Sequence, residues 1–104
     1  MKIVRVTYTL KAEFAEQNQL NIQRVMEDLQ QMSNPGIFYH VCLNADGKTF
    51  VHTAFFSQVE QEQVLFALPT FQFFQNQLKS SQPEMPPKQE LLHLVGSSTD
   101  IFNK

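Results

Sequence analysis

Apolar and polar residues alternate in four stretches of the chain, and alternation with a period of two predicts β-strands. The first stretch covers residues 3–11 and the last covers residues 89–96. The middle two lie within residues 36–56, on either side of an Asn-Ala-Asp-Gly sequence at 44–47. β-branched and aromatic residues flanking an Asp-Gly pair are typical of a hairpin, so we predict that these two strands fold back on each other.

The length of the hairpin loop decides which side chains share a face of the sheet. A two-residue turn would pair Ala45 with Lys48. A three-residue loop with Gly47 in the left-handed region would instead pair Asn44 with Lys48. We predict the three-residue loop, because Asn is favoured at the first position of such a turn and Gly at the fourth. A slip of one residue would move every side chain of one strand to the other face.

Between the strands, the apolar period changes to that of α-helices. From about residue 13 to residue 33 an apolar stripe recurs at helical spacing, formed by Ile22, Val25, Met26, Leu29 and Met32. A second helix is predicted to start at Ser57, because Ser57 and Glu60 have the spacing of a capping box. Pro69 interrupts this helix and favours the first position of a further helical segment. Three prolines within residues 80–88 predict a loop before the last strand.

The order strand, helix, strand, strand, helix, strand predicts an α+β fold, the ferredoxin-like βαββαβ arrangement with a four-stranded antiparallel sheet. Right-handed crossovers place the strands in the spatial order four, one, three, two. We predict a single domain over residues 1–96 and a C-terminal tail over residues 97–104. The apolar Ile101 and Phe102 of this tail are expected to dock on the protein.

Composition narrows the classes of function. The 104 residues contain ten Phe, no Trp and 42% hydrophobic residues, as in a globular domain with a Phe-rich core. A net charge of −2 and a charged fraction of 17% provide no basic field for nucleic acid. No apolar run approaches the ~20 residues of a membrane helix, so we expect no membrane contact. Cys42 is the single cysteine, which excludes an internal disulfide and fits a reducing, cytoplasmic location.

Both faces of the predicted sheet carry apolar side chains, although two helices can cover only one of them. The predicted register gathers on one face Val4, Val6, Tyr8, Leu10, Val41, Leu43, Val51 and Phe55. An exposed apolar face of that size usually marks an interface. We therefore predict a homodimer with two sheets packed face to face. The contact is expected through Val4, Val6, Tyr8, Val41, Val51 and Phe55.

The chain resembles the dimeric α+β barrel superfamily, and within it the antibiotic-biosynthesis-monooxygenase-like domains. The resemblance covers about residues 2–95 and rests on the element order, on the hairpin, and on the run from Phe50 to Ser57 that leads into a helix. In addition, the Leu-Pro-Thr-Phe sequence at 68–71 is similar to the Ser-Pro-x-Phe stretch that breaks the second helix in those domains. The resemblance implies a homodimer that binds a small organic ligand between sheet and helices. Several members of that group oxidise such ligands without a prosthetic group.

Several motif positions depart from the family. Members often have Glu-x-Trp at the end of the third strand, where this chain has Ala54 and Phe56. Their common histidine of the second helix corresponds to Leu65 here. Haem-degrading members use an asparagine near Thr7 together with the same tryptophan, and both positions differ in this chain. The resemblance implies that the face of Phe56 is the ligand side and that the apolar face is the dimer side.

Three side chains are candidates for catalysis. Arg5 lies in the middle of a predicted central strand, where it could bind a carboxylate or enolate, or simply pair with an acidic residue. His40 and His52 face each other in the predicted register and are candidate general bases near neutral pH. A metal site on the two histidines with Cys42 is a further alternative. No third or fourth ligand has metal-binding spacing, so we expect no metal and no other cofactor.

The candidate ligand-binding residues are mainly aromatic: Thr7, Phe38, Phe56, Phe66, Phe71 and Phe74. Aromatic residues at helical spacing also occur as plain hydrophobic core, so the sequence leaves two functions open. The first is a small homodimeric protein that binds a small organic, for example aromatic, ligand between sheet and helices and oxidises it as a cofactor-independent monooxygenase. The second is a non-catalytic binding or stress-related module whose Phe side chains close the pocket. A cavity below ~300 Å³ would favour the second.

Overall fold

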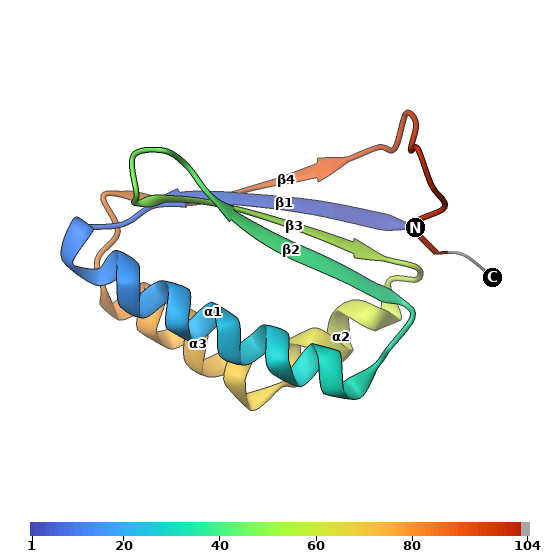
Figure 1. Ribbon diagram of the computed structural model, residues 1–104, viewed down its shortest axis with the longest axis horizontal. Coiled ribbons are helices and arrows are strands. Elements are labelled where there is room, and N and C mark those ends of the chain that lie inside the picture. Colours follow the sequence, from blue (N-terminus) through green and yellow to red (C-terminus); the bar gives the residue numbers. More distant parts are fainter. Residues whose placement is uncertain (103–104) are drawn as a thin grey trace.

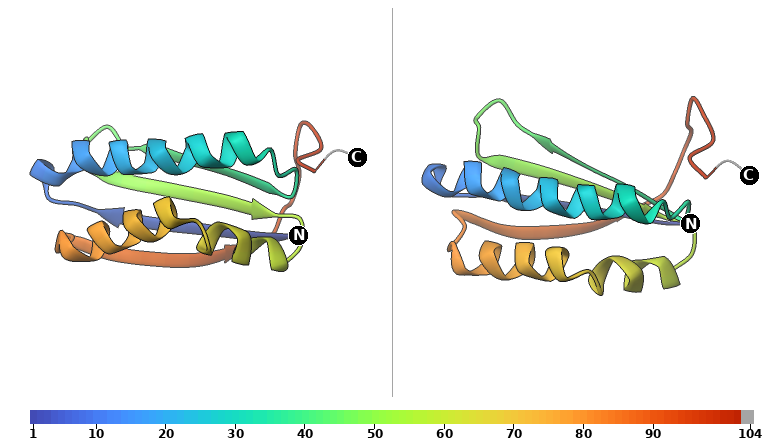
Figure 2. Two further views of the ribbon diagram at one scale, coloured as in Figure 1. Left: turned by 90° about the horizontal axis from the view of Figure 1, so that it is seen from below. Right: turned by 60° about the horizontal axis from the view of Figure 1, so that its bottom comes forward.

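Residues 1–102 are described by the computed structural model of the protein. Their elements follow in the order β1 (Lys2–Thr9), α1 (Ala12–Met32), β2 (Ile37–Leu43), β3 (Thr49–Phe56), α2 (Glu60–Phe66), α3 (Pro69–Ser80) and β4 (Met85–Leu92). The strands form one sheet in the order β2-β3-β1-β4, in which every neighbouring pair is antiparallel. All of these helices lie on one face of the sheet, with α1 and α3 side by side, and the other face is open (Figures 1 and 2).

This arrangement confirms the predicted fold class and the predicted strand order. Pro69 is also confirmed as the first residue of a helix, because α3 begins there. At the C-terminal end, Ile101 and Phe102 are half-buried and line a surface hollow with Met1 and Ser57. No helix within residues 1–102 combines the length and the apolar character that crossing a membrane requires.

Two predicted boundaries are wrong. β4 begins at Met85 and contains Pro86 and Pro87, which the sequence assigns to a loop. Proline is tolerated there because β4 is an edge strand that pairs with β1 on one side only. The predicted capping box is also not formed, since α2 begins at Glu60 without a side-chain cap at its N-terminus.

The register of the hairpin differs by one residue from the predicted one. Strands β2 and β3 pair His40 with Thr53, and the backbone N–H of Asn44 donates to the carbonyl oxygen of Thr49 at 2.8 Å. The loop therefore has four residues, 45–48. Its longer form is stabilised by the Asp46 carboxylate, which accepts the backbone N–H groups of Lys48 and Thr49 and the Thr49 hydroxyl. Because of this slip, His40 and His52 lie on opposite faces of the sheet.

The slip also changes the composition of the two faces. The helix-covered face carries the core of the sheet: Val4, Tyr8, Phe50, His52, Ala54 and Phe56, all of them buried. The predicted dimer surface is therefore wrong in part, because Val4, Val6, Tyr8 and Val41 face the helices and only Val51 and Phe55 lie on the open face. β-Strand side chains alternate, so the open face instead carries Arg5, Thr7, Phe38, His40 and Cys42 beside those two.

Candidate functional site

The two tyrosines of the chain bind the same histidine beneath the helices. The Tyr8 hydroxyl oxygen lies 2.7 Å from Nε2 of His52, and the Tyr39 hydroxyl oxygen lies 2.6 Å from Nδ1. The amide Nδ2 of Asn18 donates to the Tyr8 hydroxyl at 2.8 Å. His52 is only 5% exposed and Asn18 is fully buried. The result is a buried hydrogen-bonded chain, here called the His52 relay, formed by Asn18, Tyr8, His52 and Tyr39.

Strand pairing explains why these side chains meet. Tyr8 lies on β1, His52 on β3 and Tyr39 on β2, which are three adjacent strands of the sheet. In the observed register His52 stands between Val6 and Val41, so the tyrosines two positions along each neighbouring strand reach it diagonally. All three side chains point to the helix-covered face, and Asn18 approaches from α1 above them.

The tautomer of His52 sets the direction of the relay. The Tyr8 oxygen accepts from Asn18, and a neutral imidazole with its hydrogen on Nδ1 accepts from the Tyr8 hydroxyl and donates to the Tyr39 oxygen. In the tautomer with the hydrogen on Nε2, both bonds to the tyrosines run the other way. Tyr39 forms no other side-chain hydrogen bond within the described part of the chain, so it ends the relay.

Burial sets the protonation of the relay. Loss of solvation lowers the pKa of His52 to about 3, so its imidazole is neutral at pH 7. Burial likewise raises the pKa of Tyr8, against the smaller opposing effect of the Asn18 hydrogen bond. It raises the pKa of Tyr39 as well, with a further contribution from Tyr8. Both ring nitrogens of His52 bond to tyrosines, so the geometry supports a positioning role for His52 towards Tyr39.

A small cavity of about 140 Å³, here called the inner cavity, borders the relay between the sheet and the helices α2 and α3. Its lining brings together His52 with four of the predicted ligand-binding residues: Phe56, Phe66, Phe71 and Phe74. The Phe71 and Phe74 rings lie 5.7 Å apart, and Phe74 lies 5.4 Å from the His52 ring. These aromatic side chains fill most of the space, so the inner cavity is below the ~300 Å³ typical of drug-sized ligands.

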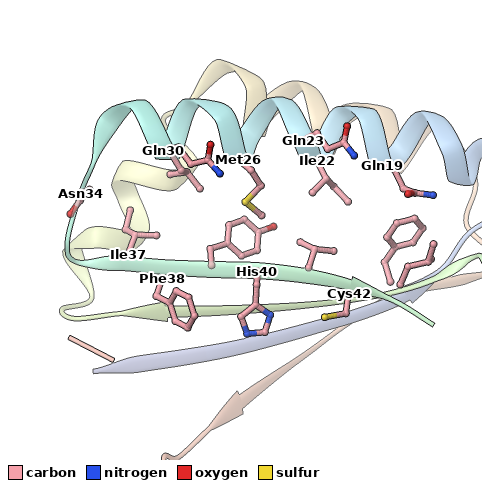
Figure 3. A pocket seen from close by; sticks show the side chains of 15 residues that line it. Gln19, Ile22, Gln23, Met26, Gln30, Asn34, Ile37, Phe38, His40 and Cys42 are labelled. Atoms are coloured by element: carbon pink, nitrogen blue, oxygen red, sulfur yellow. The ribbon is translucent and has the colours of Figure 1, made fainter. Parts of the chain in front are cut away.

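A larger cleft of about 530 Å³, here called the outer cleft, lies between α1 and the edge strand β2. Figure 3 shows Ile22 and Met26 pointing from α1 towards β2, with Gln19 and Gln23 on the same helix. No Asp, Glu, Lys or Arg is among the described residues that line the cleft. Its size is in the range of small-molecule sites, and its lining suits a neutral, largely apolar ligand.

Two predicted site residues, Arg5 and Thr7, line neither the inner cavity nor the outer cleft, and two others, Phe38 and His40, border the outer cleft at β2. Arg5 and Thr7 are on the open face of the sheet, where both Nε and Nη2 of Arg5 donate to Oε1 of Glu90 at 3.0 and 2.8 Å. This contact is the structural pair with an acidic residue that the sequence also allows. Phe38 and His40 point away from α1 on the far side of β2 (Figure 3). The predicted facing pair of histidines is therefore wrong, and with it the metal site on that pair.

The open face has its own aromatic cluster. The Phe38 ring lies 5.5 Å from that of His40 and 5.4 Å from that of Phe55, and Phe38 is 47% exposed. Cys42 is exposed on the same face. Within residues 1–102, no three His, Cys, Asp or Glu side chains come close enough to hold a metal ion.

Sequence reasoning missed three members of the His52 relay. The sequence predicts Tyr8 on the dimer face, and Tyr39 and Asn18 are not among its candidate site residues. Asn18 carried a usable signal, because an asparagine on the apolar side of an amphipathic helix must find a buried partner. Tyr39 carried none, since its contact with His52 depends on the hairpin register.

Comparison with known proteins shows where this fold occurs. No protein-family model matches the sequence, and no curated protein is significantly similar to it. Solved structures match over nearly the whole chain. One is described as an antibiotic biosynthesis monooxygenase, with a TM-score of 0.77, 14% identity, and coverage of 92% of this chain and 100% of the other. A Deinococcus radiodurans protein assigned to the same group has a TM-score of 0.73 and 19% identity, covering 96% and 97%.

A third structure is a variant of SnoaB, described as a cofactor-independent oxygenase from Streptomyces nogalater. Its TM-score is 0.68 at 13% identity, over 95% of this chain and 98% of the other. At these identities the likeness concerns the arrangement of the backbone. The chain therefore has the ferredoxin-like fold of the antibiotic biosynthesis monooxygenases.

Proposed function

We propose that this protein binds a small neutral organic molecule with a phenolic oxygen in the outer cleft and promotes its oxidation by dioxygen without a prosthetic group. The observation that carries the proposal is the position of Tyr39. Its hydroxyl ends the His52 relay, and its side chain lines a cleft of about 530 Å³. The description of SnoaB as a cofactor-independent oxygenase on the same fold supports the reaction class.

Tyr39 has a defined chemical task in this proposal. Its hydroxyl donates to the ligand oxygen, and this bond strengthens as the phenol loses its proton to solvent through the open cleft. The resulting phenolate is electron-rich and is the species that dioxygen attacks. One oxygen atom enters the ring at a carbon that bore hydrogen, and the second leaves as water, so that a phenol and O₂ give a quinone and H₂O. His52 holds the Tyr39 hydroxyl in place and remains uncharged.

Binding and turnover test the proposal separately. Binding of 2-naphthol is measured by titration calorimetry. Because the chain has no Trp and both tyrosines contact His52, tyrosine fluorescence is a second readout at the site itself. We expect 2-naphthol to bind, and Tyr39→Phe to weaken its Kd about tenfold, which is roughly the effect of one hydrogen bond. The matched control is His93→Gln, at an exposed position that lines neither cavity, which should bind like the wild type. Equal affinity of Tyr39→Phe and wild type would contradict the role of this hydroxyl.

Turnover is measured as oxygen uptake above the uncatalysed rate, with 1,4-naphthohydroquinone and simple phenols as substrates. We expect the Tyr39→Phe rate to fall at least tenfold while the His93→Gln rate is unchanged. Binding of 2-naphthol without any oxygen uptake across such substrates would favour the second candidate, a non-catalytic binding module. The observation in favour of that candidate is the inner cavity, which Phe side chains reduce to about 140 Å³.

The open face supports a second part of the proposal, a homodimer with two sheets face to face. The aromatic cluster of Phe38, His40 and Phe55 is partly exposed and has no covering helix (Figure 1). Burying such a cluster against a second copy would remove apolar area from water, at about 25 cal/mol per Å² before association costs. The oligomeric state by sedimentation is the direct measurement.

A further inference from the structure

The inner cavity has no task in the function proposed above, because it is too small for the organic ligand. We propose that it is the binding site for dioxygen, separate from the outer cleft. This inference rests on the proposed function for its need of dioxygen. Three features of the cavity support it: the chemistry of its walls, its size and its position.

The walls of the inner cavity are mainly apolar. The sheet contributes Val4, Val6, Ala54 and Phe56, and α2 and α3 contribute Leu65, Phe66, Phe71, Phe74 and Leu78. Five polar side chains complete the lining. Both ring nitrogens of His52 are hydrogen-bonded to tyrosines, one of them Tyr39, and Glu62 pairs with Lys2 at 2.8 Å, whereas Gln75 and Gln89 are exposed residues. A mainly apolar cavity accepts apolar guests.

The size of the inner cavity selects a small guest. At about 140 Å³ it holds a diatomic molecule with ease, whereas a ligand of two or more rings needs the roughly 300 Å³ or more of usual organic-ligand sites. Apolar protein cavities of about this volume, near 150 Å³, bind xenon or benzene. Xenon is therefore a suitable probe for the dioxygen site.

Tyr39 connects the two sites. Among the described residues, it is the one side chain that lines both the inner cavity and the outer cleft. A dioxygen molecule in the inner cavity and a phenol in the outer cleft would thus lie on two sides of the same tyrosine. This arrangement would supply dioxygen next to the ligand.

The first experiment detects a gas in the inner cavity without any turnover. Methyl signals are recorded by ¹H–¹³C NMR before and after saturation with xenon. We expect shifts at Val4, Val6, Leu65 and Leu78, and none at Val59, which is exposed outside the cavity. Ala54→Leu, which fills the cavity from the sheet, should abolish the shifts. The matched control Ala12→Leu, at an exposed position at the start of α1, should keep them.

The second experiment measures the dependence of oxygen uptake on dioxygen concentration with 1,4-naphthohydroquinone. We expect Ala54→Leu to raise the KM for dioxygen at least fivefold and to change the KM for the quinol less than twofold. Ala12→Leu should change neither.

The outcomes separate this inference from the proposed function. Xenon shifts that are absent or lie elsewhere, or an unchanged KM for dioxygen in Ala54→Leu, would overturn the dioxygen site even if turnover is observed. Displacement of xenon by 2-naphthol would also overturn it, since the inner cavity would then belong to the organic-ligand site. If Ala54→Leu does not fold, Val6→Leu fills the same cavity from β1 and serves in its place.

Discussion

The buried, neutral His52 makes the stability of the protein sensitive to mild acid. Its pKa is about 3 in the folded protein, and the ordinary value is 6.5. The unfolded chain therefore takes up a proton below pH 6.5 that the folded chain excludes. The contribution of the neutral His52 to the free energy of unfolding is fully present above pH 6.5. It falls as the pH decreases, until the folded protein also binds the proton near pH 3.

The size of this effect follows from the two pKa values. Below pH 6.5 each unit of pH costs about 1.4 kcal/mol, so that at pH 4 the free energy of unfolding is lower by about 3 kcal/mol than at pH 7. A domain of this size has a total stability of roughly 5–15 kcal/mol, so the loss is readily measured. The pKa of Asp46 is lowered by its bond to the Thr49 hydroxyl and that of Glu90 by Arg5. Their contributions disappear only around and below pH 4.

Urea unfolding, followed by circular dichroism between pH 7 and pH 4.5, measures the slope. His52→Gln can still bond to both tyrosines but does not titrate, so its stability should be nearly flat in this range. A further measurement needs no variant: the ¹⁵N signals of the His52 ring should retain the neutral pattern down to pH 4. Equal slopes for the wild type and His52→Gln would refute the buried neutral imidazole.

Other predictions concern single contacts. Tyr39→Phe leaves Nδ1 of His52 buried without its hydrogen-bond partner and should lower the free energy of unfolding in urea by about 1–3 kcal/mol. Arg5→Ala breaks a half-exposed ion pair and should lower the free energy of unfolding by less than about 1 kcal/mol. It should leave the binding of 2-naphthol unchanged, and a large loss of binding would show that Arg5 belongs to the ligand site. At Gly47 φ is 76°, and an added Cβ would have no heavy atom within 4 Å. Gly47→Ala should therefore lower the free energy of unfolding in urea by about 1–2 kcal/mol, through backbone strain alone. Phe55→Asp should reduce the sedimenting mass from dimer to monomer without loss of helical signal, and a wild-type monomer would contradict the face-to-face dimer.

The sequence by itself determined the order of elements and their arrangement in the sheet. Apolar alternation marks all four strands, helical spacing marks α1, and Pro69 marks the start of α3. With right-handed crossovers these elements permit few topologies, and the observed strand order is the predicted one. Such patterns are local, and each is repeated over many residues, so one unusual position does not hide them.

The candidate site was decided by tertiary structure, because it depends on single contacts. Three hydrogen bonds to the Asp46 carboxylate accompany a four-residue loop, and that one extra residue places His40 on the open face, away from His52. The turn propensities of Asn and Gly favour the shorter loop and carry no information on these bonds. Tyr8 and Tyr39 meet His52 only in the observed register, across strands far apart in the sequence. Strand pairing thus converts a one-residue difference in a loop into a different set of neighbours at the site.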